Sequence, residues 1–157
     1  MSTTQRYLGM PNAVVLCIDE FVNDDLSGRM YHSYQVEATK IVNKIDALEK
    51  MERLFNELNF PFPGNNERHF VKHEENIERG KKEKMVKDDE ILEMHGDLGT
   101  FIIRVQHRQN SSWQGRITWV EEDKTLYFRS IWEMMKLIDE AMEKYRPVDE
   151  DDTPKWD

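Results

Sequence analysis

The spacing of hydrophobic residues in the first part of the chain changes from a strand period to a helix period. Residues 13–22 (AVVLCIDEFV) are mostly β-branched or aliphatic and predict a buried strand. A turn cluster follows at 23–28, where Gly28 is free to take a positive φ. Residues 29–36 then alternate, with Met30 on one face, so the two stretches predict a β-hairpin.

Between residues 39 and 59 the apolar residues recur at helical spacing, and Thr39 is the expected N-cap. Pro61 disfavours helical geometry at the preceding residue and should end the helix, with Phe60 and Phe62 folding back over its end. The predicted buried stripe consists of Ile41, Ile45, Leu48, Met51, Phe55 and Leu58.

The pattern is weakest over residues 67–97. Residues 68–71 resemble a short strand, and 91–95 predict one more edge strand. Between them, residues 72–90 carry acidic and basic residues in near balance. That composition predicts a charged loop or a short exposed helix.

A strand period returns in the last third of the chain. Residues 101–107 alternate, with Phe101 on one face and Arg104 on the other. Residues 113–120 predict the next strand, with Ile117 and Trp119 sharing a face. After a polar turn at 121–124, a return strand should point Leu126 and Phe128 inward.

A capping box marks the start of a second helix. The Ser130 hydroxyl should accept from the Glu133 amide, and the Glu133 carboxylate should accept from the Ser130 amide. Pro147 should stop this helix, and residues 149–157 predict a disordered acidic tail. The expected buried stripe consists of Ile131, Met134, Met135, Ile138, Met142 and Tyr145.

Together these elements predict one α+β domain over residues 1–148. We expect a mostly antiparallel sheet built from two strand–turn–strand–helix halves, with two helices packed on one face. Gly28-Arg29 and Gly115-Arg116 occupy similar places in the two halves. The match between the halves is otherwise too slight to indicate a duplication.

Charge narrows the expected partners. The 157 residues carry a net charge of −9 and a pI of about 5.1, which disfavours nucleic acid, because such binders use Lys and Arg to neutralise phosphates. We expect a cytoplasmic protein that binds another protein and no membrane. Cys17 lies in an apolar run and is expected to be a small core residue.

No catalytic signature is present, and no cofactor or metal is expected. The histidines are scattered and none is paired at ligand spacing (His32, His69, His73, His95 and His107). Asp19 and Glu20, which end the first strand, are the only carboxylate pair of interest, and solvent exposure explains them as well. An enzyme would need a pocket that brings His32 or His107 to a carboxylate.

The strongest functional candidate is the segment 104–115, which includes the loop between two predicted strands. It combines guanidinium groups that bind anions, amides that hydrogen-bond polar groups of a ligand, and an indole on which a ring can stack. The same side chains could equally hold the connection together through bonds to the backbone, with Trp113 as a core anchor. The candidate binding residues are Arg104, Arg108, Gln109, Asn110, Ser112, Trp113 and Gln114.

Arg104, Arg108, Asn110, Ser112 and Gly115 form Arg-x-x-x-Arg followed by Asn-x-Ser-x-x-Gly, which resembles the cyclic-di-GMP signature of PilZ domains. In that family the arginines precede the barrel and the second element lies well downstream. Here a single residue separates the two elements, and the two helices do not suit a six-stranded barrel.

A second resemblance covers most of the chain. The segments GRMYHSY, MERLFNELNFPFP, RVQHRQNSSWQG, ITW and FRSIWEMMKLID are similar to a group of uncharacterised small bacterial proteins. That resemblance implies a bacterial, single-domain protein and no particular activity.

The leading functional hypothesis is a non-enzymatic interaction or regulatory module, with an inhibitor as one form of it. It would bind another macromolecule through its acidic surface and the loop at 104–115. The alternative is a sensor that binds an anionic small ligand, such as a cyclic dinucleotide, through Arg104, Arg108, Asn110 and Trp113. The negative net charge disfavours RNA binding across the sheet face.

Overall fold

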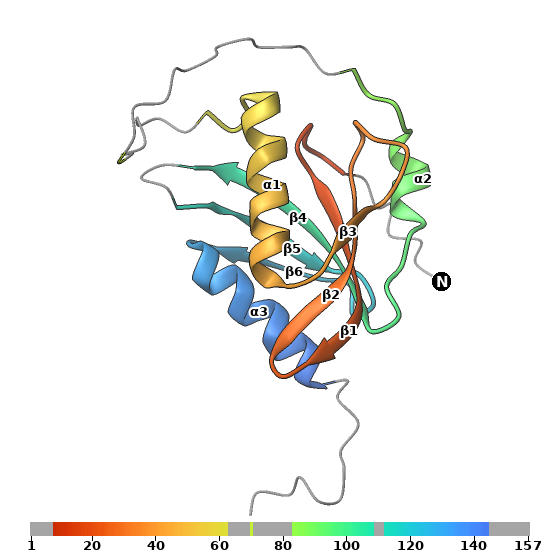
Figure 1. The fold of residues 1–157 in the computed structure, drawn as a ribbon, viewed down its shortest axis with the longest axis vertical. Coiled ribbons are helices and arrows are strands. Elements are labelled where there is room, and N and C mark those ends of the chain that lie inside the picture. The colour runs from red at the N-terminus through yellow and green to blue at the C-terminus, as the bar shows by residue number, and fades with distance from the viewer. Residues whose placement is uncertain (1–7, 63–69, 71–82, 109–111, 145–157) are drawn as a thin grey trace, which may run out of the picture.

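The computed structural model describes residues 8–62, 70, 83–108 and 112–144. In this part of the chain, six strands form one antiparallel sheet in the order β3-β2-β1-β4-β5-β6 (Figure 1). The α+β class and the antiparallel sheet are confirmed. The elements are β1 Val14–Val22, β2 Asp25–Tyr31, β3 Thr39–Ile41, α1 Lys44–Leu58, α2 Asp88–Leu92, β4 Gly99–His107, β5 Gln114–Trp119, β6 Lys124–Phe128 and α3 Ile131–Lys144.

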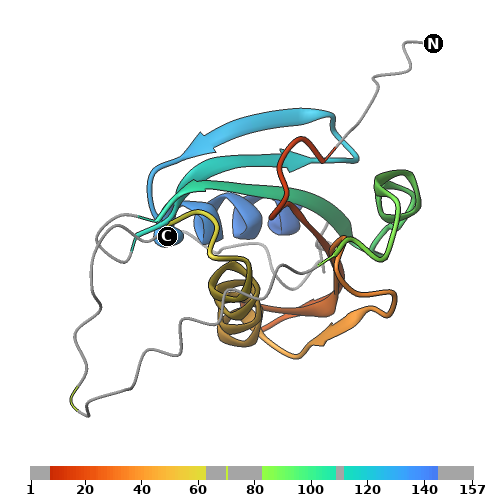
Figure 2. The ribbon, with the colours of Figure 1, turned by 90° about the horizontal axis from the view of Figure 1, so that it is seen from above.

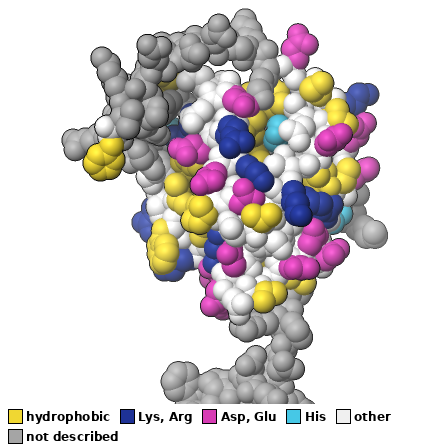
Figure 3. Space-filling model, in the orientation of Figure 1, with side chains coloured by type: hydrophobic (Ala, Val, Ile, Leu, Met, Phe, Trp, Pro, Cys, Tyr) yellow, Lys and Arg dark blue, Asp and Glu magenta, His cyan; other side chains and the backbone are white. Residues whose placement is uncertain are grey.

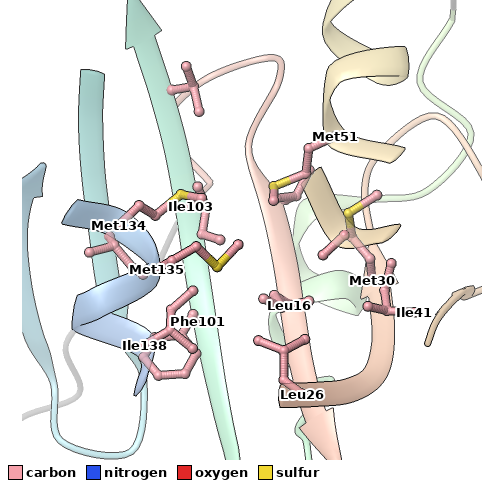
Figure 4. Close-up of a cluster of buried hydrophobic side chains, with 14 of the residues drawn as sticks. Leu16, Leu26, Met30, Ile41, Met51, Phe101, Ile103, Met134, Met135 and Ile138 are labelled. Atoms are coloured by element: carbon pink, nitrogen blue, oxygen red, sulfur yellow. The ribbon is translucent and has the colours of Figure 1, made fainter. Parts of the chain in front are cut away.

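The main core lies between the sheet and the helices α1 and α3. Alternate residues of β1 (Val14, Leu16 and Ile18) point into it, as the strand period requires. Figure 2 shows both helices on the inner side of the curved sheet, with α2 apart from them. Side chains from both helices meet those of the strands in this core, including Met51, Phe101, Ile103, Met134, Met135 and Ile138 (Figure 4).

A second, smaller cluster covers the other face of the sheet. Val15 and Cys17 of β1 and Ile102 of β4 pack there against Leu8 and against Ile91 of α2. Burial raises the pKa of the Cys17 thiol to about 12, so the side chain stays a neutral thiol. Cys17 is therefore a small core residue, as predicted.

The chain folds as two copies of the same strand–strand–strand–helix unit. The first copy is β1, β2, β3 and α1, and the second is β4, β5, β6 and α3. One constant shift in residue number relates them throughout: Gly28 pairs with Ile41 as Gly115 pairs with Phe128. The buried helix residues correspond under the same shift, since Ala47, Met51, Leu54 and Phe55 match Met134, Ile138, Ala141 and Met142.

The pairing of β1 with β4 has the same internal symmetry. Val15 lies opposite Ile102, its own counterpart, while Val14 lies opposite Ile103 and Leu16 opposite Phe101. An approximate two-fold axis therefore passes between Val15 and Ile102. The structure thus shows a repeat that the amino-acid identities alone were too few to reveal.

Gly28 and Gly115 have the same role in the two copies. Each faces a bulge in the neighbouring strand, at Ile18–Glu20 of β1 and at Val105–His107 of β4. A Cβ atom on Gly28 would lie 1.9 Å from the Cys17 carbonyl oxygen, and one on Gly115 would lie 2.0 Å from that of Arg104. The sheet needs glycine here because the two backbones approach closely.

This placement corrects the predicted turn at 23–28. Gly28 lies within β2, and the hairpin turns at Asn23 and Asp24, whose φ values are 55° and 60°. Two consecutive left-handed residues suit the twist of a two-residue hairpin, and Asn and Asp tolerate that conformation. The second strand is also shorter than expected, since β2 ends at Tyr31.

The first helix begins later than predicted. Residues 39–41 form β3, and the N-cap is Asn43, whose side chain accepts from the Asp46 amide. Ile41 is buried from a strand rather than a helix, and Ile45 is 62% exposed. The helix ends at Asn59 in the left-handed conformation, and neither Phe60 nor Phe62 is buried over it.

Helix α3, the second of the two helices expected from the sequence, starts at the predicted cap with one change. Ser130 Oγ accepts from the Glu133 amide at 3.0 Å, but the Glu133 carboxylate accepts from the amide and guanidinium of Arg129. Met134, Met135, Ile138 and Met142 are buried, Ile131 is partly buried, and Tyr145 lies outside the described residues.

The edge strand expected at 91–95 is wrong. Ile91 and Leu92 belong to the short helix α2, and Ile91 is 2% exposed in the smaller cluster. So short an apolar run fits the period of a strand and that of a helix. The packing of Ile91 against Cys17 and Leu8 decides in favour of the helix. The stretch at 68–71 and the acidic tail at 149–157 fall outside the described residues, apart from an exposed Phe70.

Candidate functional site

Arg104 of β4 is only 9% exposed and belongs to the scaffold. Its Nε donates to the Leu8 carbonyl at 2.7 Å, and its Nη1 donates to Thr118 Oγ1 at 2.9 Å. Asn12 adds a bond from its side-chain amide to the Val105 carbonyl at 2.9 Å. Arg104 therefore ties the segment before β1 to the outer face of the sheet.

Arg108 is 4% exposed and lies at the C-terminal end of α1. Its guanidinium donates to the carbonyls of Phe55 (3.3 Å) and Pro61 (2.8 Å) and to Asn56 Oδ1 (2.8 Å). A cation is favourable there because the last carbonyls of a helix carry partial negative charge. Arg108 thus joins the second copy of the repeat to the helix of the first.

Trp113 is a core anchor. It is 4% exposed and meets the Phe55 ring edge-on, with ring centroids 5.2 Å apart. Ser112 is half-buried, Gln114 is exposed, and Gln109 and Asn110 fall outside the described residues. Arg104, Arg108 and Trp113 are thus buried in contacts with other parts of the fold, and the two guanidinium groups donate to carbonyls on opposite sides of the sheet.

The two carboxylates at the end of β1, Asp19 and Glu20, also have different surroundings. Arg29 donates to both oxygens of Asp19, at 3.0 and 3.2 Å, which holds the pKa of that carboxyl below its usual value. Glu20 is exposed and is not part of the ion pair between Arg29 and Asp19. Among the described residues, no group of three or more His, Cys, Asp or Glu is arranged to hold a metal ion.

A groove between β6 and α3 is the feature that the sequence did not single out. It encloses about 390 Å³ beside the inner face of the sheet. Leu126 and Leu137 line it, and Leu126 is 54% exposed, although it points inward as predicted. The other apolar lining residues are Phe101, Ile117, Trp119 and Ala141.

Two lysines and one glutamate line this groove. Lys124 pairs with Trp119 across β5 and β6, and Lys144 Nζ lies 5.6 Å from the centre of the Trp119 ring. Lys144 also meets Glu122 at 3.5 Å, in a contact that is exposed on the lysine side. Glu140 lines the rim of the groove as well. Lys124, Lys144 and Glu140 therefore line the same groove as the Trp119 ring, and Lys144 lies against that ring.

Acidic residues do not gather into a single field on the face that carries α1 and α3. Figure 3 shows acidic, basic and hydrophobic side chains interspersed over it. On this face, local shape and apolar lining distinguish the groove better than net charge does. The sequence signal was Leu126, which the strand period points inward and which nevertheless remains half-exposed.

Comparison of the chain with protein-family models, with curated proteins and with solved structures finds no match. Among the described residues, no helix has the length and apolar character needed to cross a membrane.

Proposed function

We propose that this protein is a non-enzymatic module that binds another protein, and that the groove between β6 and α3 receives a segment of the partner. The observation that carries the proposal is the apolar groove itself, which opens beside exposed Leu126. Burying Leu126, Leu137 and the Trp119 ring would contribute about 25 cal/mol per Å² of apolar area removed from water.

The partner segment should carry a hydrophobic side chain close to a carboxylate. The hydrophobic side chain suits the lining of Leu126, Leu137 and Ala141, and the carboxylate suits Lys124 and Lys144 at the Trp119 end. Local charge at the groove would therefore select the segment, although the molecule as a whole is acidic.

The sensor hypothesis has less support. It needs Arg104 and Arg108 to converge on one anion, whereas each guanidinium donates to carbonyl groups of the protein on its own side of the sheet. A bound nucleotide would have to replace those bonds.

A random peptide display library tests the proposal without a known partner. Selection on the wild-type protein should enrich peptides that place a hydrophobic residue near Asp or Glu. Binding of a purified selected peptide should fall at least tenfold in Leu126→Thr. Tyr127→Thr is the matched control, because Tyr127 is also exposed on β6 but is the next residue along, pointing to the other face.

The result against the proposal is equally plain. If no peptide is enriched, or if every selected peptide binds Leu126→Thr as well as wild type, the groove is not a protein-binding site.

A further inference from the structure

Among the described residues, no strand covers the outer edge of β6, whereas the corresponding edge of β3 is short and partly occupied. β6 has five residues. β3 has three residues, and Lys50 Nζ donates to the carbonyl oxygen of Lys40 within it. An open edge strand presents unpaired N–H and C=O groups, which proteins usually protect.

The two edges differ in their side chains at corresponding positions as well. Thr39, Lys50 and Leu54 in the first copy become Leu126, Leu137 and Ala141 in the second. In the first copy, Lys50 bonds to Asp46 at 2.9 Å and spans from α1 to β3. In the second copy, two leucines and a small alanine leave the apolar groove instead.

From this difference we infer that the partner segment adds to β6 as a seventh strand of the sheet. The inference rests on the proposed function and specifies how the partner binds. A strand along β6 would pair with its free backbone groups and would place every second side chain on the inner face, beside Leu126 and the groove. One such side chain would fill the groove while backbone bonds supply much of the affinity.

A second copy of this chain suits the edge less well than a foreign segment does. A symmetric dimer through β6 would bring together two chains that each carry a net charge of −9, and the Lys124 and Lys144 ammonium groups of both chains would lie near one contact together with Glu122 and Glu140. An acidic segment of another protein meets those ammonium groups with opposite charge.

Backbone methylation of a selected peptide tests strand addition directly. Each amide of the peptide is N-methylated in turn and its affinity for the full chain is measured. We expect losses of roughly tenfold or more at alternate amides only, because alternate N–H groups of an added strand point toward β6. Replacing the hydrophobic anchor of the peptide by Ala should weaken binding irrespective of methylation.

Other patterns of loss would overturn the inference in distinguishable ways. Tight, Leu126-dependent binding that no single methylation weakens would reject strand addition and keep the groove as a binding site. Absence of any Leu126-dependent peptide would reject both proposals. Sedimentation showing a dimer that Leu126→Thr dissociates would assign the edge to a second copy of the chain.

Discussion

The two copies of the repeat follow one chain path and differ most at one corresponding edge. In the first copy, Lys50 connects α1 to the three-residue strand β3. In the second copy, Leu126 and Leu137 flank a groove beside the five-residue strand β6. The two copies share the order and pairing of their strands, so the difference lies in the length of the edge strand and in a few side chains. This difference makes the second edge a candidate for function.

Alanine substitution at the two corresponding glycines tests whether the close backbone approach has the same energetic cost in both copies. Gly28→Ala and Gly115→Ala should each lower the free energy of unfolding by about 2–3 kcal/mol, because the new Cβ meets a carbonyl oxygen of the neighbouring strand. Chemical denaturation measures both changes, with Gln114→Ala on the same strand as the neutral control. Tolerance of either alanine would contradict the equivalent close approach.

Arg108 tests a difference between the copies. Arg108→Ala should cost about 2–3 kcal/mol, since it leaves carbonyl groups at the end of α1 without their donor. Its counterpart in the first copy is Phe21, which is only partly buried, so Phe21→Ala should cost less in the same denaturation experiment. Equal or reversed costs would remove the role assigned to Arg108.

The two helix caps should again behave alike. Asn43→Ala and Ser130→Ala should each cost about 1 kcal/mol, because each side chain accepts from the backbone amide three residues later. Thermal melts of the two variants give the comparison. A large loss in one variant and none in the other would show that the corresponding helices begin differently.

The bulges should differ in their response to pH. Arg29 keeps the pKa of Asp19 low, so the carboxylate stabilises the fold above the pKa of the unfolded chain, and this contribution is lost as pH falls through the folded pKa. Asp19→Asn should therefore cost roughly 0.5–1 kcal/mol near pH 7 and progressively less in acid. Gln106→Ala, at the corresponding bulge, should leave the pH profile unchanged. An unaltered profile in Asp19→Asn would contradict the pairing.

The sequence predicted those features that depend on neighbours along the chain. Ser130 caps its helix because the cap needs only the amide of Glu133. Residues of β4 alternate between the two core clusters because the strand period is local. Ile41 was misassigned because one buried isoleucine suits a helix stripe as well as a strand. Only the β2–β3 pairing decides between them.

The candidate site depended on distant partners and was therefore harder to predict. Arg104 and Arg108 have the composition of an anion site, yet Leu8 and Pro61, brought close by the fold, accept their bonds. The groove could not be predicted from the sequence either, because its lining combines Leu126 of β6 with Leu137 and Ala141 of α3. The pattern showed that Leu126 points inward but not that it stays uncovered.

Mapping a selected peptide on the protein by backbone amide shifts in NMR is the most direct test of the functional difference between the two copies. We expect large shifts along β6 and on the side of α3 that carries Leu137 and Ala141, with β3 and α1 unaffected. Shifts centred on β3 and α1, or spread equally over both edges, would contradict this expectation.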